Sequence, residues 1–255
     1  MEVIEAMGYY FPDGFNPGSL TFRTEEFQRN DVTVRLEIPT VTRAFVEVLA
    51  DYLIKKRESY LARLPIERII DILDKASRLW LDRDYPYRKM ALKTIPVITG
   101  FSPEVVEASI DAEMESSLKA DMWRALQSEI GNPRYLDDFQ YSEALTGYCR
   151  AFGPELIVSF FSENIPALPH LLFMRSALVK AACLGKVAAG EPTFAPLYLK
   201  TIEEIDPEMA RSMAVLYWRG GEEGVEDAAF DQADAVIVFG GVEACKSLID
   251  RIPRR

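Results

Sequence analysis

Four short apolar runs decide the fold of this chain: LIVSFF at residues 156–161, CLGKV at 183–187, MAVLYW at 213–218 and ADAVIVF at 233–239. Each run is rich in aliphatic, β-branched or aromatic residues and is followed by a turn and a helical pattern. Because parallel strands need long crossovers, this rhythm predicts an α/β fold with a Rossmann-like, mostly parallel sheet flanked by helices. Ligands of such sheets bind outside the carboxyl ends of the strands, so function is expected in the loops after these runs.

The composition is that of a globular protein that would not bind nucleic acid. The 255 residues are 49% hydrophobic, and a net charge of −11 would repel a phosphate backbone. The amino terminus lacks the pattern of a secretory signal, and no apolar run reaches the ~18 residues of a membrane span. Three cysteines without a CxxC spacing and a single histidine predict neither a disulfide framework nor a metal site. We therefore expect a cytoplasmic protein.

Changes in the hydrophobic pattern divide the chain into three regions. Residues 20–38 alternate between apolar and polar positions, which predicts a β-ribbon within an amino-terminal region of residues 1–40. Apolar residues then recur at helical spacing, so residues 41–150 are predicted to form a helical region. Residues 151–255 contain the four apolar runs and form the predicted nucleotide-binding domain.

One long helix is expected near the end of the helical region. Ser102 supplies an N-cap, Pro103 a preset first turn, and Glu104 a negative charge beside the positive end of the helix. Gly131 interrupts the pattern, so this helix should run to about Ile130, with a further short helical stretch before the strands begin.

Three strand-to-helix turns carry residues that suit a nucleotide. Residues 162–166 follow the first run, where backbone N–H groups can meet a pyrophosphate or a nicotinamide, although ordinary turns share this spacing. Lys186 can donate to a ribose hydroxyl or phosphate, and Gly190 permits close approach of a ligand; a solvated loop lysine is the alternative. Gly240 and Gly241 leave N–H groups uncovered after the fourth run, although such glycines also serve turns without ligands.

The other reactive side chains suit structural roles. His170 follows Pro169 in a helical segment, which predicts a partly packed side chain. Cys183 and Cys245 occupy positions where sulfur usually fills a core, and neither these residues nor Cys149 has a base partner that the sequence reveals. We therefore expect none of the three cysteines to be a nucleophile.

Taken together, several short motifs resemble the LuxC-type long-chain acyl-CoA reductases of bacteria, which belong to the aldehyde dehydrogenase superfamily. In the second half of the chain the motifs are LIVS at 156–159, ENIP at 163–166, LGK at 184–186, GEPTF at 190–194, VLYW at 215–218 and AVIVFGG at 235–241. The resemblance extends upstream through WLD at 80–82, PYR at 86–88 and TGFSPE at 99–104. It covers most of the chain, and the combination is specific although each motif alone is weak.

For the adenosine end of a cofactor, the resemblance implies binding by the loop after the second run. Lys186 stands where the superfamily places a lysine that contacts the adenosine ribose, and Gly190 and Glu191 follow in the same motif. Ala189 replaces a glutamate that often binds this ribose. Loss of that carboxylate relieves repulsion of a 2′-phosphate, so NADPH is the expected cofactor.

The resemblance also implies roles for two other loops. Gly240 stands where the superfamily has a glycine beside the cofactor pyrophosphate, and Gly241 replaces the neighbouring serine. Asn164 falls where the superfamily holds an asparagine near the reacting carbonyl, and it is the one catalytic residue expected in this chain.

The implied reaction converts an acyl-CoA or acyl-protein thioester to an aldehyde through a thioacyl-enzyme that NADPH reduces. The family's acyl-accepting cysteine lies in a further domain, and none of the three cysteines here matches it. We expect this chain to be the cofactor-binding part of such an enzyme, inactive alone, with the catalytic domain supplied elsewhere, for example by a companion chain. The alternative is a non-catalytic binding or assembly module that retains the fold.

Overall fold

The computed structural model describes residues 2–253, apart from the side chains of Glu223 and Ala244. Its centre is a four-stranded parallel sheet in the order β8-β7-β6-β9. The strands are β6 (Leu156–Phe160), β7 (Ala182–Lys186), β8 (Met213–Leu216) and β9 (Ala235–Val238). All four predicted runs are strands, and the predicted α/β fold is confirmed.

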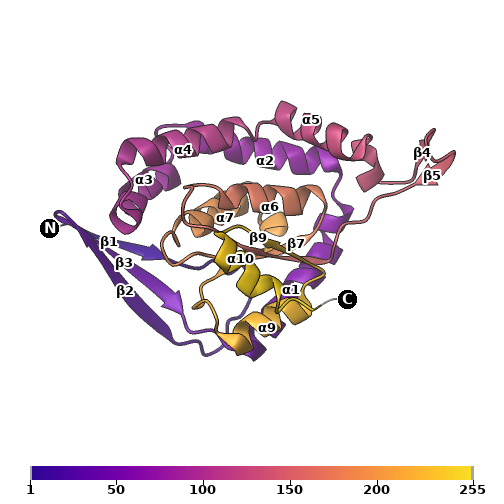
Figure 1. The fold of residues 1–255 in the computed structure, drawn as a ribbon. Coiled ribbons are helices and arrows are strands. Elements are labelled where there is room, and N and C mark those ends of the chain that lie inside the picture. Colours follow the sequence, from indigo (N-terminus) through magenta and orange to yellow (C-terminus); the bar gives the residue numbers. More distant parts are fainter. Residues whose placement is uncertain (1, 254–255) are drawn as a thin grey trace.

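Helices cover both faces of this sheet (Figure 1). One face carries α6 (Pro169–Leu178) and α7 (Phe194–Ile205), and the other carries α1 (Arg43–Ser59) and α9 (Glu223–Gln232). Because side chains alternate along a strand, Leu184 of β7 packs in the cluster with α1 and α9, whereas Cys183 packs in the cluster with α6 and α7. Two buried faces explain why the strands read as continuous apolar runs.

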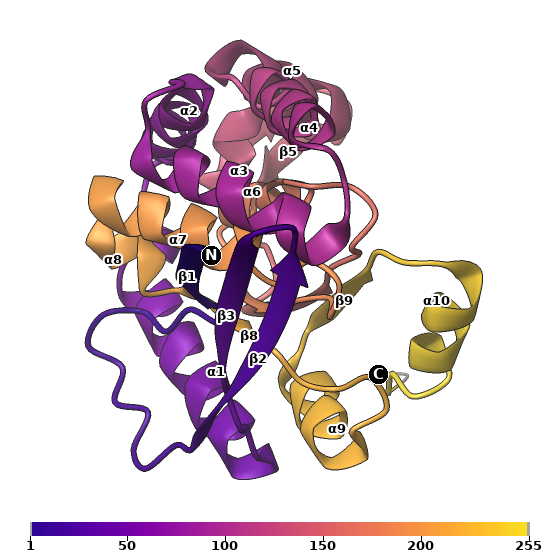
Figure 2. The same cartoon turned by 90° about the vertical axis from the view of Figure 1, so that its left-hand side faces the viewer.

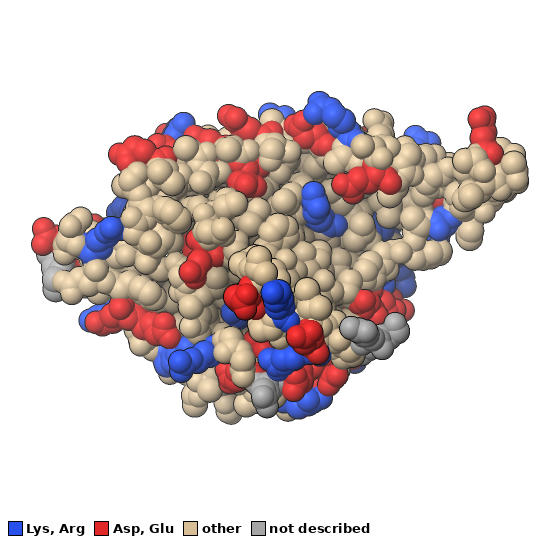
Figure 3. Space-filling view, in the orientation of Figure 1, with Lys and Arg blue, Asp and Glu red and all other residues tan. Residues whose placement is uncertain are grey.

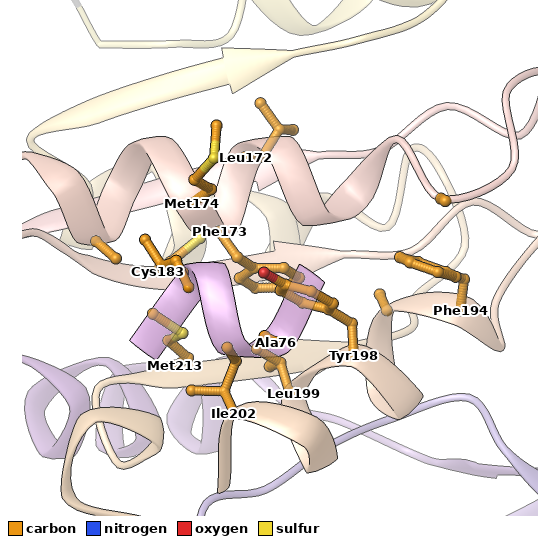
Figure 4. Close-up of a cluster of buried hydrophobic side chains, with 14 of the residues drawn as sticks. Ala76, Leu172, Phe173, Met174, Cys183, Phe194, Tyr198, Leu199, Ile202 and Met213 are labelled. Carbon is orange, nitrogen blue, oxygen red and sulfur yellow. The ribbon is translucent and has the colours of Figure 1, made fainter. Parts of the chain in front are cut away.

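A second layer of helices lies outside α6 and α7 (Figure 1). It consists of α2 (Ile66–Leu81), α3 (Pro86–Thr99), α4 (Pro103–Glu115) and α5 (Lys119–Ile130). Trp80 at the end of α2 is fully buried, and its indole N–H donates to the Thr201 hydroxyl of α7 at 2.9 Å. Figure 4 shows the apolar cluster beneath this layer, where Ala76 of α2 meets Phe173 of α6 and Tyr198 of α7.

The amino-terminal sheet has three strands, one more than predicted (Figure 2). The predicted ribbon corresponds to β2 (Phe22–Arg29) and β3 (Val32–Pro39), which pair antiparallel. The unpredicted strand β1 (Glu2–Met7) pairs parallel with β3. Backbone hydrogen bonds between Tyr10 and Val215 of β8 then join the segment after β1 to the central sheet.

The single helix predicted from Ser102 to Ile130 is wrong, because the structure divides it into α4 and α5. The break falls at residues 116–118. Ser117 in this break is buried, its hydroxyl is hydrogen-bonded to Nε2 of His170 at 2.8 Å, and its carbonyl accepts from Ser77 at 3.2 Å. These tertiary contacts stabilise a turn that the local helical pattern does not reveal.

A projecting β-hairpin lies in the region predicted to be helical. After the 3₁₀ turn Pro133–Leu136, β4 (Gln140–Ser142) and β5 (Gly147–Cys149) pair antiparallel. The rings of Tyr141 and Tyr148 meet edge to face across the pair, with 5.6 Å between centroids. Figure 1 shows this hairpin extending away from the body of the molecule. The short helical stretch predicted here is therefore only the 3₁₀ turn, and the hairpin was not predicted.

Three short elements complete the chain: the 3₁₀ turn Leu61–Arg63, α8 (Pro207–Ala210) and α10 (Val242–Ile249). The predicted region boundaries near residues 40 and 150 fall in connections between elements. The division into domains stays a prediction, and the last two residues of the third predicted domain lie outside the described range. Within residues 2–253, none of the helices combines the length and apolar character needed to cross a bilayer. Figure 3 shows acidic and basic side chains interspersed over one face.

Gly185 in β7 lies directly under an aromatic ring, so we predict that alanine at this position destabilises the fold. A Cβ atom there would stand 2.5 Å from Cζ of Phe161 and 3.2 Å from Cζ of Phe173. Because neighbouring core atoms yield little, Gly185→Ala should lower the free energy of unfolding by about 2 kcal/mol, measurable by urea denaturation. Gly224→Ala is the control, since a Cβ there meets no described atom within 4 Å; equal effects of the two substitutions would contradict the prediction.

Candidate functional site

The carboxyl edge of the central sheet contains the point where the strand order reverses. The chain passes from β6 to β7 and β8 on one side of β6, then returns to β9 on the other side. Phe160 at the end of β6 is the register partner of both Lys186 and Val238. Lys186 and Val238, which leads to Gly240, therefore lie at the same edge of the sheet. Two strand spacings separate them, or about 10 Å. Ligands of open α/β sheets bind at such a reversal.

Lys186 presents a cation with unfilled hydrogen-bond donors at this edge. Its side chain is half-buried at the end of β7, so it is not the solvated loop lysine considered above. Burial lowers the pKa of its ammonium group, and the negative charges of Glu226 and Glu163 partly oppose this shift. Among the described residues no hydrogen bond or ion pair engages the ammonium. The group can therefore donate to a bound hydroxyl or phosphate.

Glu226 is a buried carboxylate that the sequence analysis did not single out. Its Oε1 accepts from the Trp218 indole N–H at 3.3 Å and from the Gly221 amide at 3.2 Å, and its Oε2 pairs with Arg251. It lies on α9 beside Val225 on the apolar face of that helix. The sequence signal that could have identified Glu226 is an acidic residue within an apolar helix face, because a buried carboxylate requires hydrogen-bond or ionic partners.

Gly190 lies against a carboxylate from the neighbouring loop. Its amide donates to Oε2 of Glu163 at 3.0 Å, and a Cβ atom at Gly190 would stand only 2.4 Å from the same oxygen. The absence of a side chain therefore lets the loops after β6 and β7 approach each other. Glu163 was also missed in the sequence, where nothing local distinguishes it from other exposed acids.

Glu191, although predicted to bind the cofactor, contacts the start of α7. Its carboxylate is buried, and Oε1 accepts from the amides of Thr193 and Phe194 at 3.0 Å and from the Thr193 hydroxyl at 2.9 Å. Burial raises the pKa of Glu191, and these three hydrogen bonds oppose the shift. This arrangement satisfies amides that a helix start otherwise leaves without partners. Its observed contacts are thus those of a helix cap.

The loop after β6 exposes Asn164 and is held by a buried histidine. Ala167 in this loop has a positive φ of 69°, and its carbonyl accepts from Nδ1 of His170 at 2.8 Å. Nε2 of the same ring faces the Ser117 hydroxyl at 2.8 Å. Burial lowers the pKa of His170 to about 4, so the ring is neutral near pH 7. The prediction of a partly packed side chain is corrected, since His170 is fully buried.

Gly240 and Gly241 are exposed where β9 passes into α10. Gly241 has an extended backbone and precedes the first turn of α10, and a Cβ atom there would meet no described atom within 4 Å. The Gly240 carbonyl accepts a weak hydrogen bond from the Cys245 thiol at 3.5 Å. Packing among the described residues therefore does not explain the glycine at position 241, and the backbone there is open to a ligand.

Cys183, by contrast, is part of the core. Its side chain is fully buried, and burial raises the pKa of the thiol to about 11. The thiol is therefore protonated near neutral pH and is not a nucleophile in this environment.

A mostly apolar cavity of about 450 Å³ lies beside the start of α7. The amino-terminal sheet, α3 and α7 form its walls, and Met7, Tyr87 and Leu197 are among the lining residues. Lys186, Gly190 and Gly240 are not among them. Thr193 is among them, however, and it donates to Glu191, so the cavity adjoins the loop after β7.

Two named relatives match most of this chain, but the chain matches less than half of their length. The chain is 24% identical over 196 residues to the long-chain acyl-protein thioester reductase of Photorhabdus luminescens, a match that covers 74% of this chain and 40% of the relative. The long-chain acyl-protein thioester reductase of Vibrio harveyi is also 24% identical, over 199 residues. This match covers 76% of this chain and 41% of the relative. The chain spans less than half the length of these relatives.

Solved structures with a similar fold are aldehyde dehydrogenases. Glyceraldehyde-3-phosphate dehydrogenase GapN from Methanocaldococcus jannaschii, complexed with NADP, gives a TM-score of 0.65 at 14% identity and covers 85% of this chain and 45% of its own. Betaine aldehyde dehydrogenase from Staphylococcus aureus, in complex with NAD+, gives a TM-score of 0.66 at 15% identity. The match covers 90% of this chain and 44% of that enzyme. At such low identity the likeness establishes the fold alone.

The sequence-based family assignment rests on a longer stretch than any single motif. The family described as acyl-CoA reductase (LuxC) matches residues 61–255, which is about three quarters of the chain. The resemblance read from the short motifs is thereby confirmed. The chain belongs to the LuxC family of acyl-CoA reductases.

Proposed function

We propose that the edge formed by the loops after β6, β7 and β9 binds a nicotinamide dinucleotide, and that the cofactor is NADPH. The observation that supports this most directly is the unengaged ammonium of Lys186 at the strand-order reversal, on the same edge as the open backbone at Gly241. Two solved structures with this fold are complexes with NADP or NAD+. A dinucleotide has both a ribose and a pyrophosphate to engage these two groups.

Each group has a separate task in this proposal. Lys186 donates hydrogen bonds to the adenosine ribose or its phosphate, and its position on a strand keeps the donor fixed. The backbone N–H groups at Gly240 and Gly241 face the pyrophosphate at the start of α10. Asn164, exposed on the loop braced by His170, orients the carbonyl of the substrate. Bound NADPH supplies hydride for the reduction.

We further propose that the chain is the cofactor-binding portion of a reductase that converts long-chain acyl thioesters to aldehydes. Its relatives from Photorhabdus luminescens and Vibrio harveyi are described as acyl-protein thioester reductases, and the chain matches about two fifths of their length. The nucleophilic thiolate that takes the acyl group then comes from a domain outside these 255 residues, in the same or a companion chain. The substrate is an acyl-CoA or an acyl-protein thioester.

Titration of the 255-residue chain with NADPH tests the proposal. We expect saturable binding by calorimetry, with the 2′,5′-ADP fragment competing for the same site. We also expect no aldehyde when NADPH and a long-chain acyl-CoA are added together, since the nucleophile is not in this chain. Absence of saturable binding at millimolar NADPH would rule out the cofactor site, and aldehyde formation would rule out the missing-nucleophile proposal.

One observation favours the second candidate function, a non-catalytic assembly module. The projecting β4–β5 hairpin exposes large apolar side chains at Phe139, Tyr141, Leu145, Tyr148 and Phe152. Exposed apolar groups gathered on one projection are typical of protein contacts. For such a module the same titration yields no NADPH binding, so one experiment separates the two functions.

A further inference from the structure

Glu163 places a carboxylate between the loops after β6 and β7. Its Oε2 is anchored by the Gly190 amide at 3.0 Å, and its side chain is exposed to solvent. Its other oxygen, Oε1, accepts no hydrogen bond from the described residues. One oxygen is therefore fixed by the protein, while the other is available to a ligand.

This carboxylate shares its surroundings with Lys186. The two residues follow or end adjacent strands, β6 and β7, whose last residues are in register. The charge of Glu163 is also among those that act on the ammonium of Lys186. In the segment after β7, Ala189 carries no charge and the carboxylate of Glu191 is buried against the start of α7. Glu163 therefore supplies an exposed carboxylate from a different loop.

We propose that Glu163 is a specificity-determining residue, which accepts a hydrogen bond from the adenosine ribose and opposes a 2′-phosphate. This inference rests on the proposed cofactor site. A carboxylate beside the ribose favours a 2′-hydroxyl, because the hydroxyl donates to it, and disfavours a 2′-phosphate, because like charges repel. Glu163 thus reduces the preference for NADPH over NADH that Ala189 permits.

Glu163→Gln tests this role with little structural change, because the amide oxygen can still accept from Gly190. We expect NADPH affinity to rise about fivefold and NADH affinity to fall about twofold, so their ratio changes about tenfold, the effect of one charge at moderate screening. Competition by 2′,5′-ADP and 5′-ADP should show the same change, which locates the effect at the adenosine end.

Glu58→Gln is the matched control. Glu58 is an exposed acid near the end of α1, next to Arg57, which donates to the Lys180 carbonyl just before β7 at the opposite edge of the sheet. Its loss should leave the ratio unchanged. An unchanged or lowered NADPH-to-NADH affinity ratio in Glu163→Gln would overturn the assignment while leaving the cofactor site intact. Failure of the unsubstituted chain to bind either dinucleotide would instead overturn both proposals.

Discussion

Arg88→Ala is expected to lower the free energy of unfolding by about 4 kcal/mol, because it empties a fully buried position and removes the cation shared by a backbone carbonyl and two carboxylates. The Arg88 side chain is completely buried on α3. Its Nη1 donates to the Trp80 carbonyl at 2.7 Å and to Oδ1 of Asp111 at 2.6 Å, and its Nη2 contacts Glu107 at 3.2 Å. One guanidinium therefore joins α2, α3 and α4, and its removal affects all three. Denaturant unfolding of the purified variant measures the loss.

Arg83 provides a control that shares the same partners. It also pairs with Glu107 and Asp111, but 62% of its side chain is exposed to solvent. Exposed ion pairs contribute little, so Arg83→Ala should cost no more than about 1 kcal/mol. Comparable losses for the two variants would show that the acids, rather than burial of Arg88, determine the effect.

Lys186→Met should weaken NADPH binding about 30-fold, or about 2 kcal/mol, by removing charge-assisted hydrogen bonds. Methionine keeps an unbranched apolar stem in the half-buried position while removing the ammonium. Calorimetric titration measures the change, and circular dichroism checks that the fold is retained.

Lys89→Met is the charge-matched control for this variant. Lys89 pairs with Asp84 on the surface, and 54% of its side chain is exposed. Loss of general positive charge would weaken NADPH binding equally in both variants, whereas a specific site responds only to Lys186→Met. Unchanged affinity in Lys186→Met would contradict the assignment of this lysine and favour the assembly module.

The central sheet could be predicted because β6, β7 and β8 are buried on both faces and β9 is half-buried. Runs such as LIVSFF have no other stable placement in a chain that alternates them with helical patterns. The β1 strand could not be found this way, because Val3 is exposed and only Ile4 of the strand is fully buried. The break between α4 and α5 depends on Ser117 meeting His170, a contact 53 residues apart in sequence. Local propensity does not contain that information.

The candidate site was partly predictable for a similar reason. Parallel strands bring their carboxyl ends to one edge, so Lys186 and Gly240 could be expected together from the sequence. Glu163 could not, because its importance depends on the 3.0 Å contact with Gly190 across two loops. Glu191 appears in the same motif as Gly190, yet its side chain turns to the α7 amides. Sequence position therefore identifies the loop but not the direction of its side chains.

The brace formed by His170 has a chemical consequence for the proposed reaction. His170 is the only histidine in these 255 residues, and both of its ring nitrogens are hydrogen-bonded. Because burial lowers its pKa to about 4, the ring is uncharged near pH 7. A reduction that ends in an aldehyde and a free thiol must return a proton to sulfur. Within these 255 residues no histidine is free to relay that proton, so solvent or a general acid other than histidine has to deliver it.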